Sequence, residues 1–156
     1  MAKKNIRGFT LIELIVVMAI IAVLALIIIP VLFGFVRDSN VSKLNANARS
    51  IYSGSQMGVV QLVKEGGDPV ANAVYLKAAS GNEAVCSGNP NIKVNLYLGD
   101  DFKGYFGFKI DSTGTGVEYA VWSNQSLTSS DVVQLTESQV EASVYTSKPI
   151  GCYPLK

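Results

Sequence analysis

A single carboxylate stands inside an apolar stretch near the N-terminus. Residues 9–36 contain 24 apolar side chains out of 28, and Glu13 is the only charged residue among them. A carboxylate in a membrane-spanning helix costs about 2.5–3.5 kcal/mol, so Glu13 requires a partner or a function. The nearest cations are Arg7 and, if the chain is cut after Gly8, the new α-amino group of Phe9, which is charged over much of the neutral range. The alternative is a carboxylate that lies in the headgroup layer.

Several other kinds of chemistry find no support in the sequence. The chain has no histidine, and it contains neither a Gly-x-Ser-x-Gly motif nor a phosphate-binding loop. The acidic residues Asp100, Asp101, Asp111 and Asp131 are not spaced like a calcium loop and are interpreted as solvated turn residues. A formal net charge of +1 excludes a strongly basic nucleic-acid-binding protein. We therefore expect no enzymatic activity, no metal, no cofactor and no nucleic-acid partner.

The apolar stretch is long enough to cross a membrane. From Leu14 to Val36 no side chain is charged or forms hydrogen bonds, and as a helix this segment measures about 35 Å, against about 30 Å for a bilayer core. Lys3, Lys4 and Arg7 precede it, which predicts a cytoplasmic N-terminus and a translocated remainder. The alternative, a buried helix of a soluble core, is disfavoured because so small a domain could hardly cover the helix on every side.

The residues around Glu13 resemble a known processing signal. Positions 3–15 read Lys-Lys-Asn-Ile-Arg-Gly-Phe-Thr-Leu-Ile-Glu-Leu-Ile, and this string is similar to the cleavage and methylation signature of type IV pilins and pseudopilins. The resemblance implies cleavage after Gly8 by a prepilin peptidase and N-methylation of Phe9. It also implies that Glu13 meets the N-terminal amine of a neighbouring subunit during assembly. Pro30 lies where many members of the family carry a helix-bending proline, and proline chemistry itself predicts a kink or a locally melted segment there.

Downstream of the apolar stretch, the sequence predicts an amphipathic helix over residues 37–64. Apolar and small residues recur there at steps of three and four, and Gly66 with Gly67 ends the pattern. Gly54 and Gly58 form a small-residue face on which either the sheet of this chain or another subunit packs closely. The recurring positions are Val41, Leu44, Ala48, Ile51, Ser55, Val59 and Leu62.

The C-terminal part is predicted to be mainly β-structure. After a short helix that begins at Asp68 and ends before Gly81, alternating apolar residues predict three strands of an antiparallel meander, with one face on the amphipathic helix. Thr136 and Gln139 fit a capping box at the start of a further short helix. The alternating residues are Ile92, Val94, Leu96 and Leu98, then Phe106, Phe108 and Ile110, then Val117, Tyr119 and Val121.

Two cysteines, Cys86 and Cys152, are separated by 65 residues. This spacing fits neither a redox pair nor a zinc clamp. Outside the cytoplasm we expect a disulfide between them that encloses the sheet, which the loop-entropy model credits with about 4 kcal/mol. Two free buried thiols are the alternative. So wide a loop departs from the commonest arrangement in the family that the N-terminus resembles.

These features predict an α+β protein with the type IV pilin fold, in which a long N-terminal helix packs on an antiparallel sheet. We expect a leader at 1–8, a transmembrane or polymer-core helix at 9–36, an amphipathic half at 37–64 and a globular head at 65–156. The predicted function is a homopolymeric surface filament for adhesion, motility or related roles. A pseudopilin of a secretion or DNA-uptake system and a membrane-tethered domain that keeps its leader are the alternatives. The expected partners are the prepilin peptidase and N-methyltransferase, an assembly platform, and the cytoplasmic membrane, where the single-pass precursor resides before export.

Overall fold

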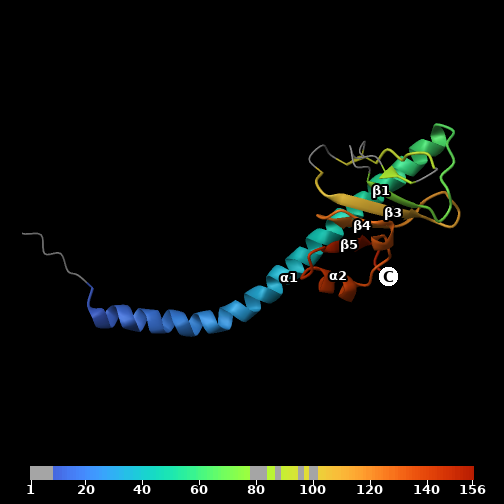
Figure 1. Ribbon diagram of the computed structural model, residues 1–156. Coiled ribbons are helices and arrows are strands. Elements are labelled where there is room, and N and C mark those ends of the chain that lie inside the picture. The colour runs from blue at the N-terminus through green and yellow to red at the C-terminus, as the bar shows by residue number, and fades with distance from the viewer. Residues whose placement is uncertain (1–8, 78–83, 87–88, 95–96, 99–101) are drawn as a thin grey trace, which may run out of the picture. The chain divides into compact units, whose positions relative to one another are not determined.

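The computed structural model describes residues 9–77, 84–86, 89–94, 97–98 and 102–156 (Figure 1). The chain forms two compact units that divide between Val36 and Arg37. In chain order the helices and strands are α1 (Leu11–Lys64), β1 (Val74–Lys77), β2 (Ala84–Val85), β3 (Tyr105–Ile110), β4 (Val117–Ser123), the 3-10 helix η2 (Ser129–Asp131), α2 (Glu137–Ser143) and β5 (Ile150–Tyr153).

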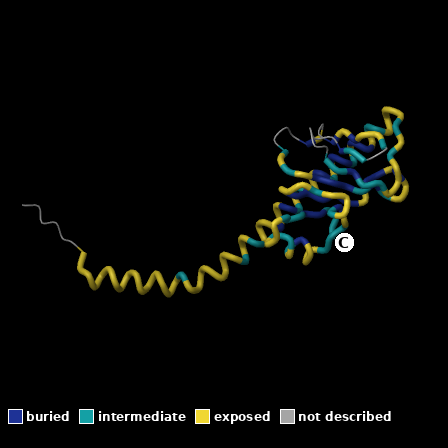
Figure 2. The backbone as a smooth tube through the Cα atoms, viewed as in Figure 1, coloured by how far each residue is buried: buried dark blue, intermediate teal, exposed yellow. Residues whose placement is uncertain are grey.

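The first unit consists of the apolar part of α1, which is exposed on every side (Figure 2). Every large apolar side chain between Phe9 and Val36 is at least 49% exposed. This helix is long and apolar enough to cross a membrane, although length and composition are the only criteria that it meets. The helix continues without interruption through Pro30, so the locally melted segment predicted there is absent, whereas a kink at Pro30 stays a prediction.

In the second unit, α1 is amphipathic, as the periodicity predicts. It ends in a Schellman motif: Gly67 N donates to Leu62 O and Gly66 N donates to Val63 O, both at 3.0 Å. Gly66 adopts the required left-handed conformation, with φ of 82°. The buried residues of α1 recur at steps of three and four, and they are Val41, Leu44, Ala48, Ile51, Gly54, Ser55, Gly58 and Val59.

The sheet has five antiparallel strands in the order β2-β1-β3-β4-β5. Phe106 pairs with Trp122 and Trp122 pairs with Gly151, so these three residues share one face. This face packs on α1, because a Cβ atom added at Gly151 would overlap the carbonyl group of Leu44. Close contact between β5 and α1 therefore requires glycine at position 151.

The opposite face of the sheet is covered by the segment that contains η2 and α2. The hydroxyl of Tyr119 in β4 donates to the carbonyl of Val132 at 3.0 Å, and Val140 of α2 is fully buried. Thr136 and Gln139 form the predicted capping box at the start of α2, with Thr136 N donating to Gln139 Oε1 at 2.8 Å. The predicted α+β class, a long helix packed on an antiparallel sheet, is confirmed.

Two predicted elements are wrong, and both lie before β3. The segment after Asp68 forms no helix, because Asn72 adopts a left-handed conformation with φ of 60° and the chain then pairs with β3 as strand β1. Of the strand predicted from Ile92 onward, the described residues form only one isolated bridge, between Ile92 and Ala84. Positions 95–96 of that strand lie outside the described residues.

The segment from Ile92 onward packs on α1 instead of joining the sheet. A Cβ atom at Gly58 would lie 2.7 Å from Ile92 Cγ2, and one at Gly54 would lie 3.3 Å from Leu98. The glycine face of α1 is therefore occupied by this chain itself, although by this segment and not by the sheet, which was the alternative to another subunit. The edge strand β5 was not predicted, because four residues next to a proline carry a weak strand signal.

Candidate processing and assembly site

The start of α1 is a reciprocal cap built from Thr10 and Glu13. Glu13 Oε2 accepts hydrogen bonds from Thr10 N at 2.8 Å and from Thr10 Oγ1 at 2.7 Å. In return, Glu13 N donates to Thr10 Oγ1 at 3.3 Å. This is a capping box, which satisfies two of the backbone donors that a helix leaves unpaired at its N-terminus. The carboxylate therefore also stabilises its own helix.

Thr10 is the residue whose role sequence reasoning missed. The signal was present, since Thr-x-x-Glu before an apolar segment is the pattern of a capping box. The partners predicted for Glu13 were the cation of Arg7 and the amine of a processed Phe9. Arg7 and Gly8 lie outside the described residues, and Phe9 is 91% exposed at the start of the described chain.

The predicted disulfide between Cys86 and Cys152 is contradicted by the structure, where both thiols are free. Cys86 directly follows β2 and Cys152 lies in β5, at opposite edges of the five-stranded sheet. Four strand spacings of about 4.8 Å separate the two edges, whereas a disulfide needs Cα atoms within about 7 Å. The spacing of the cysteines in the sequence gave no information on the strand order that separates them.

The two thiols have different surroundings. Cys152 is fully buried, near the carbonyl of Val133 and the backbone N–H of Leu135, and burial raises the pKa of its thiol. Cys86 is partly buried and accepts a hydrogen bond from the side chain of Asn89 at 3.1 Å. The alternative of free thiols therefore describes the structure, although only Cys152 is fully buried.

Of the four acidic residues interpreted as turn residues, the structure describes two, Asp111 and Asp131, and both form hydrogen bonds or ion pairs with other side chains. Asp111 Oδ1 accepts from Thr113 Oγ1 at 2.8 Å, and this bond, with backbone bonds from Thr113 and Thr115, lowers the pKa of Asp111. Asp131 pairs with Lys148 at 2.6 Å. Asp100 and Asp101 lie outside the described residues. In the described part of the chain, no three His, Cys, Asp or Glu residues gather into a metal-binding group.

Of the comparisons with known proteins, one gives a match, and this match covers only the N-terminal part of the chain. Residues 3–29 match the family model for the prokaryotic N-terminal methylation motif. No curated protein and no solved structure matches the chain. The motif marks a structural rather than an enzymatic family, and with the apolar helix it fits a membrane-anchored precursor that is processed and assembled into a pilus-like polymer. The chain thus carries the prepilin-type signature that type IV pilins and pseudopilins share.

Proposed function

We propose that this protein is the structural subunit of a type IV pilus and polymerises through α1 into a surface filament. The observation that carries the proposal is the methylation motif at residues 3–29, followed directly by a helix whose apolar side chains are exposed on every side. Such a helix requires either lipid or other apolar helices around it. A polymer of identical helices provides the second environment after the membrane has provided the first.

Processing creates the end that assembles. The prepilin peptidase cuts after Gly8, removes residues 1–8 as a leader and leaves Phe9 to be N-methylated. The new amine is a cation four residues from Glu13, in a segment that has no Lys or Arg. Residues 9–36 then serve first as the membrane anchor and later as the polymer core, with Pro30 as the position of a bend. The filament is assembled on a platform in the cytoplasmic membrane and extends outside the cell, where it acts in adhesion, motility or related surface roles.

Glu13 has one oxygen available for a neighbouring subunit. Both hydrogen bonds from Thr10 end on Oε2, and among the described residues none donates to Oε1. An incoming ammonium group can bind Oε1 without breaking the helix cap. We propose that this second oxygen accepts the Phe9 amine of the next subunit, so that assembly neutralises a charge that is costly in an apolar surrounding.

The alternative function is a pseudopilin of a type II secretion or DNA-uptake system. Pseudopilins share the methylation motif. A disulfide would favour a pilin, but both cysteines are free, so the thiols give no support to a pilin over a pseudopilin. The two functions differ in where the polymer extends. A pilus projects far from the cell, whereas the polymer of a pseudopilin stays within the envelope.

Two measurements test the proposal. Mass spectrometry of the mature protein should show N-methylphenylalanine at Phe9, and an intact leader would contradict both functions. Immunogold electron microscopy of producing cells, with a deletion strain as control, should label whole filaments along their length. Label that is confined to the envelope would reject the pilus and favour the pseudopilin.

A further inference from the structure

Tyr145, in the turn that follows α2, is unusually exposed for an aromatic side chain. It is 74% exposed, the largest value among the large apolar side chains described after Val36. The turn itself is fixed by hydrogen bonds: Thr146 N donates to Ser143 O at 2.9 Å, and Ser143 Oγ bonds to both the N–H and the carbonyl of Ile150. An exposed tyrosine on such a fixed support is typical of a protein–protein interface.

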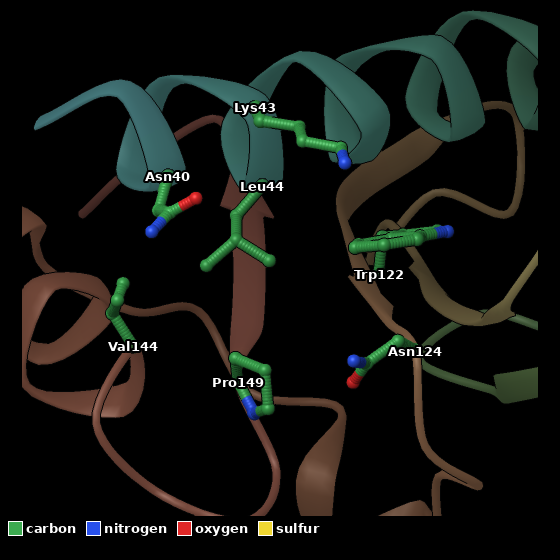
Figure 3. A pocket seen from close by; sticks show the side chains of 7 residues that line it. All are labelled: Asn40, Lys43, Leu44, Trp122, Asn124, Val144 and Pro149. Atoms are coloured by element: carbon green, nitrogen blue, oxygen red, sulfur yellow. The ribbon is translucent and has the colours of Figure 1, made fainter. Parts of the chain in front are cut away.

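A glutamate accompanies this tyrosine. Glu141 lies four residues before Tyr145, so the two side chains are neighbours on one side of α2, and Glu141 forms no ion pair with a described residue. Val144, between them, lines a cavity of about 240 Å³ together with Asn40 and Leu44 (Figure 3). Glu141 and Tyr145, called here the α2 surface, therefore lie beside the first residues of the amphipathic half of α1.

The last residues of α1 carry a second exposed surface, which is apolar and basic. Met57 and Val60 are each about half exposed. Two adjoining depressions of about 290 and 390 Å³ share Met57 and Tyr97, and Lys64 lines the first of them. No Asp or Glu is among the described residues that line either depression, and Lys64 forms no ion pair with a described residue. Met57, Val60, Lys64 and Tyr97 are called here the Met57 surface.

The two surfaces complement each other but cannot meet within one chain. Residues 40–44 and 57–64 of α1 are separated by about 28 Å at a rise of 1.5 Å per residue. A tyrosine ring packs favourably on a methionine sulfur, and a glutamate pairs with a lysine. Contact of either surface with a copy of itself would instead bring like charges together, Glu141 against Glu141 or Lys64 against Lys64.

We propose that the α2 surface of one subunit binds the Met57 surface of another, with Tyr145 in the depressions beside Met57 and Glu141 paired with Lys64. Because the two surfaces differ and are displaced along α1, each contact leaves one of each kind free. The contact therefore repeats into an open helical polymer and does not close into a dimer. This proposal rests on the proposed function, to which it adds a contact between neighbouring heads.

Cysteine cross-linking of the polymer from producing cells tests the contact directly. The variant carries Met57→Cys and Tyr145→Cys in a Cys86→Ser background, since Cys86 is the native thiol that is not fully buried. Oxidation with copper phenanthroline should join successive subunits into a ladder of bands on non-reducing gels. Either cysteine substitution alone should give monomers only, because each disulfide needs one cysteine from each surface.

Charge exchange tests the ion pair. Glu141→Lys and Lys64→Glu should each lower the yield of polymer about fivefold or more, because like charges then face each other. The two substitutions combined in one chain should restore the yield, since the pair forms again with the opposite polarity. Lys103→Glu, which reverses an exposed lysine in neither surface, is the matched control and should leave the yield unchanged.

Two results would overturn this contact while the proposed function stands. The first is a polymer of the double-cysteine variant whose subunits stay monomeric on the gel after oxidation. The second is a combined charge variant that assembles no better than the single ones, although its head unfolds at the same urea concentration as the wild type. If the wild-type protein forms no polymer at all, the proposed function fails, and this contact fails with it.

Discussion

The hydrogen bonds of Glu13 complete a helix cap on one oxygen of the carboxylate and leave the other for the proposed docking contact. Its Oε2 atom completes the N-terminal cap with Thr10, and its Oε1 atom is available for the proposed bond to a neighbouring amine. Removing the side chain loses both interactions, whereas replacing Thr10 loses only the cap, which costs about 1 kcal/mol. These two positions therefore separate helix stability from subunit docking.

Glu13→Ala should abolish filament assembly while cleavage and membrane insertion continue, because the apolar segment is unchanged, whereas the acceptor for the neighbouring amine is lost together with the helix cap. Filament yield, measured by shearing and immunoblotting, and the processed mass of the protein report the two steps. Thr10→Val, which keeps the carboxylate, should retain filaments. Glu137→Ala, a glutamate in the first turn of α2, is the control for the substitution itself. Normal filament yield from Glu13→Ala would disprove the docking role.

Asp131 gives a prediction for the pH dependence of stability. Its carboxylate accepts from Lys148 at 2.6 Å and from Thr128, and these bonds lower its pKa from 3.8 to about 2. A pKa that is lower in the folded state stabilises the fold above the unfolded pKa, and this contribution is lost as the pH falls through the folded pKa. Asp131→Asn should therefore lower the free energy of unfolding by about 1–2 kcal/mol at pH 7.

The difference between Asp131→Asn and the wild type should shrink between pH 4 and pH 2, the range set by the two pKa values. Urea unfolding followed by Trp122 fluorescence measures it. Asp68→Asn, at an exposed position, is the matched control and should behave like the wild type. If Asp131→Asn lowers the free energy of unfolding by the same amount at pH 7 and pH 2, the lost stability does not come from the ion pair between Asp131 and Lys148.

The cysteines should behave as two unequal free thiols. Thiolates react with maleimides, so the raised pKa and full burial of Cys152 protect it, whereas the partly buried Cys86 is accessible. Mass spectrometry of the folded protein at pH 7 should find one label, on Cys86, and the urea-unfolded protein should carry two without any reductant. A single disulfide-linked peptide on non-reducing mapping would refute this arrangement.

At the scale of elements, the crossing of β5 over α1 is tightly constrained. An added Cβ atom at Gly151 would overlap the Leu44 carbonyl, which is backbone and cannot rotate away. Nearby, the rings of Tyr52 and Tyr153 meet edge to face with centroids 5.3 Å apart. These contacts hold the last strand against the helix and leave no space for a larger residue.

Gly151→Ala should destabilise the head by about 3 kcal/mol or more, because the strand must move away from α1 to relieve the overlap. Urea unfolding monitored by Trp122 fluorescence measures the loss. Gly34→Ala is the matched control, since a Cβ atom there meets nothing within 4 Å, and it should leave the head unchanged. If Gly151→Ala unfolds at the same urea concentration as this control, the close crossing is incorrect.

Sequence reasoning succeeded for elements whose signal is local. The steps of three and four from Val41 to Val59 gave the buried face of α1, and Thr136 with Gln139 gave the start of α2. It failed for segments whose structure depends on which distant part of the chain they pair with. Residues 74–77 become a strand because β3 offers a partner, and Ile92 leaves the sheet because Gly58 offers a space on α1.

The processing motif needed only local information, whereas the cleavage, methylation and docking roles of its residues stay predictions. Gly8, Phe9 and Glu13 form a contiguous motif that the family model also matches, so no long-range contact had to be inferred. The disulfide, in contrast, depended on which strands lie at the edges of the sheet. Two cysteines separated by 65 residues carry no information on that order.

At the scale of the whole molecule, processing should change the charge measurably. The full chain has 13 basic and 12 acidic residues, and the leader contains three of the basic ones, so the mature chain has 10 against 12 and its formal charge falls from +1 to −2. The precursor has an isoelectric point of about 7.7, whereas that of the mature protein should lie below 7. The precursor should therefore focus at a higher pH than the mature protein. Isoelectric focusing with and without the peptidase checks this shift, and identical positions would show that the leader is retained.

The contact between β5 and α1 also sets the order in which the head can fold. Cys152 N bonds to Asn45 Oδ1 across 107 positions of sequence, and β5 ends only three residues before the C-terminus. Such distant partners meet late, and a growing chain emerges N-terminus first. While α1 is already complete, the sheet lacks its edge strand β5 until residues 150–153 have been synthesised. The head therefore cannot reach its final shape until β5 has left the ribosome, long after α1 is complete.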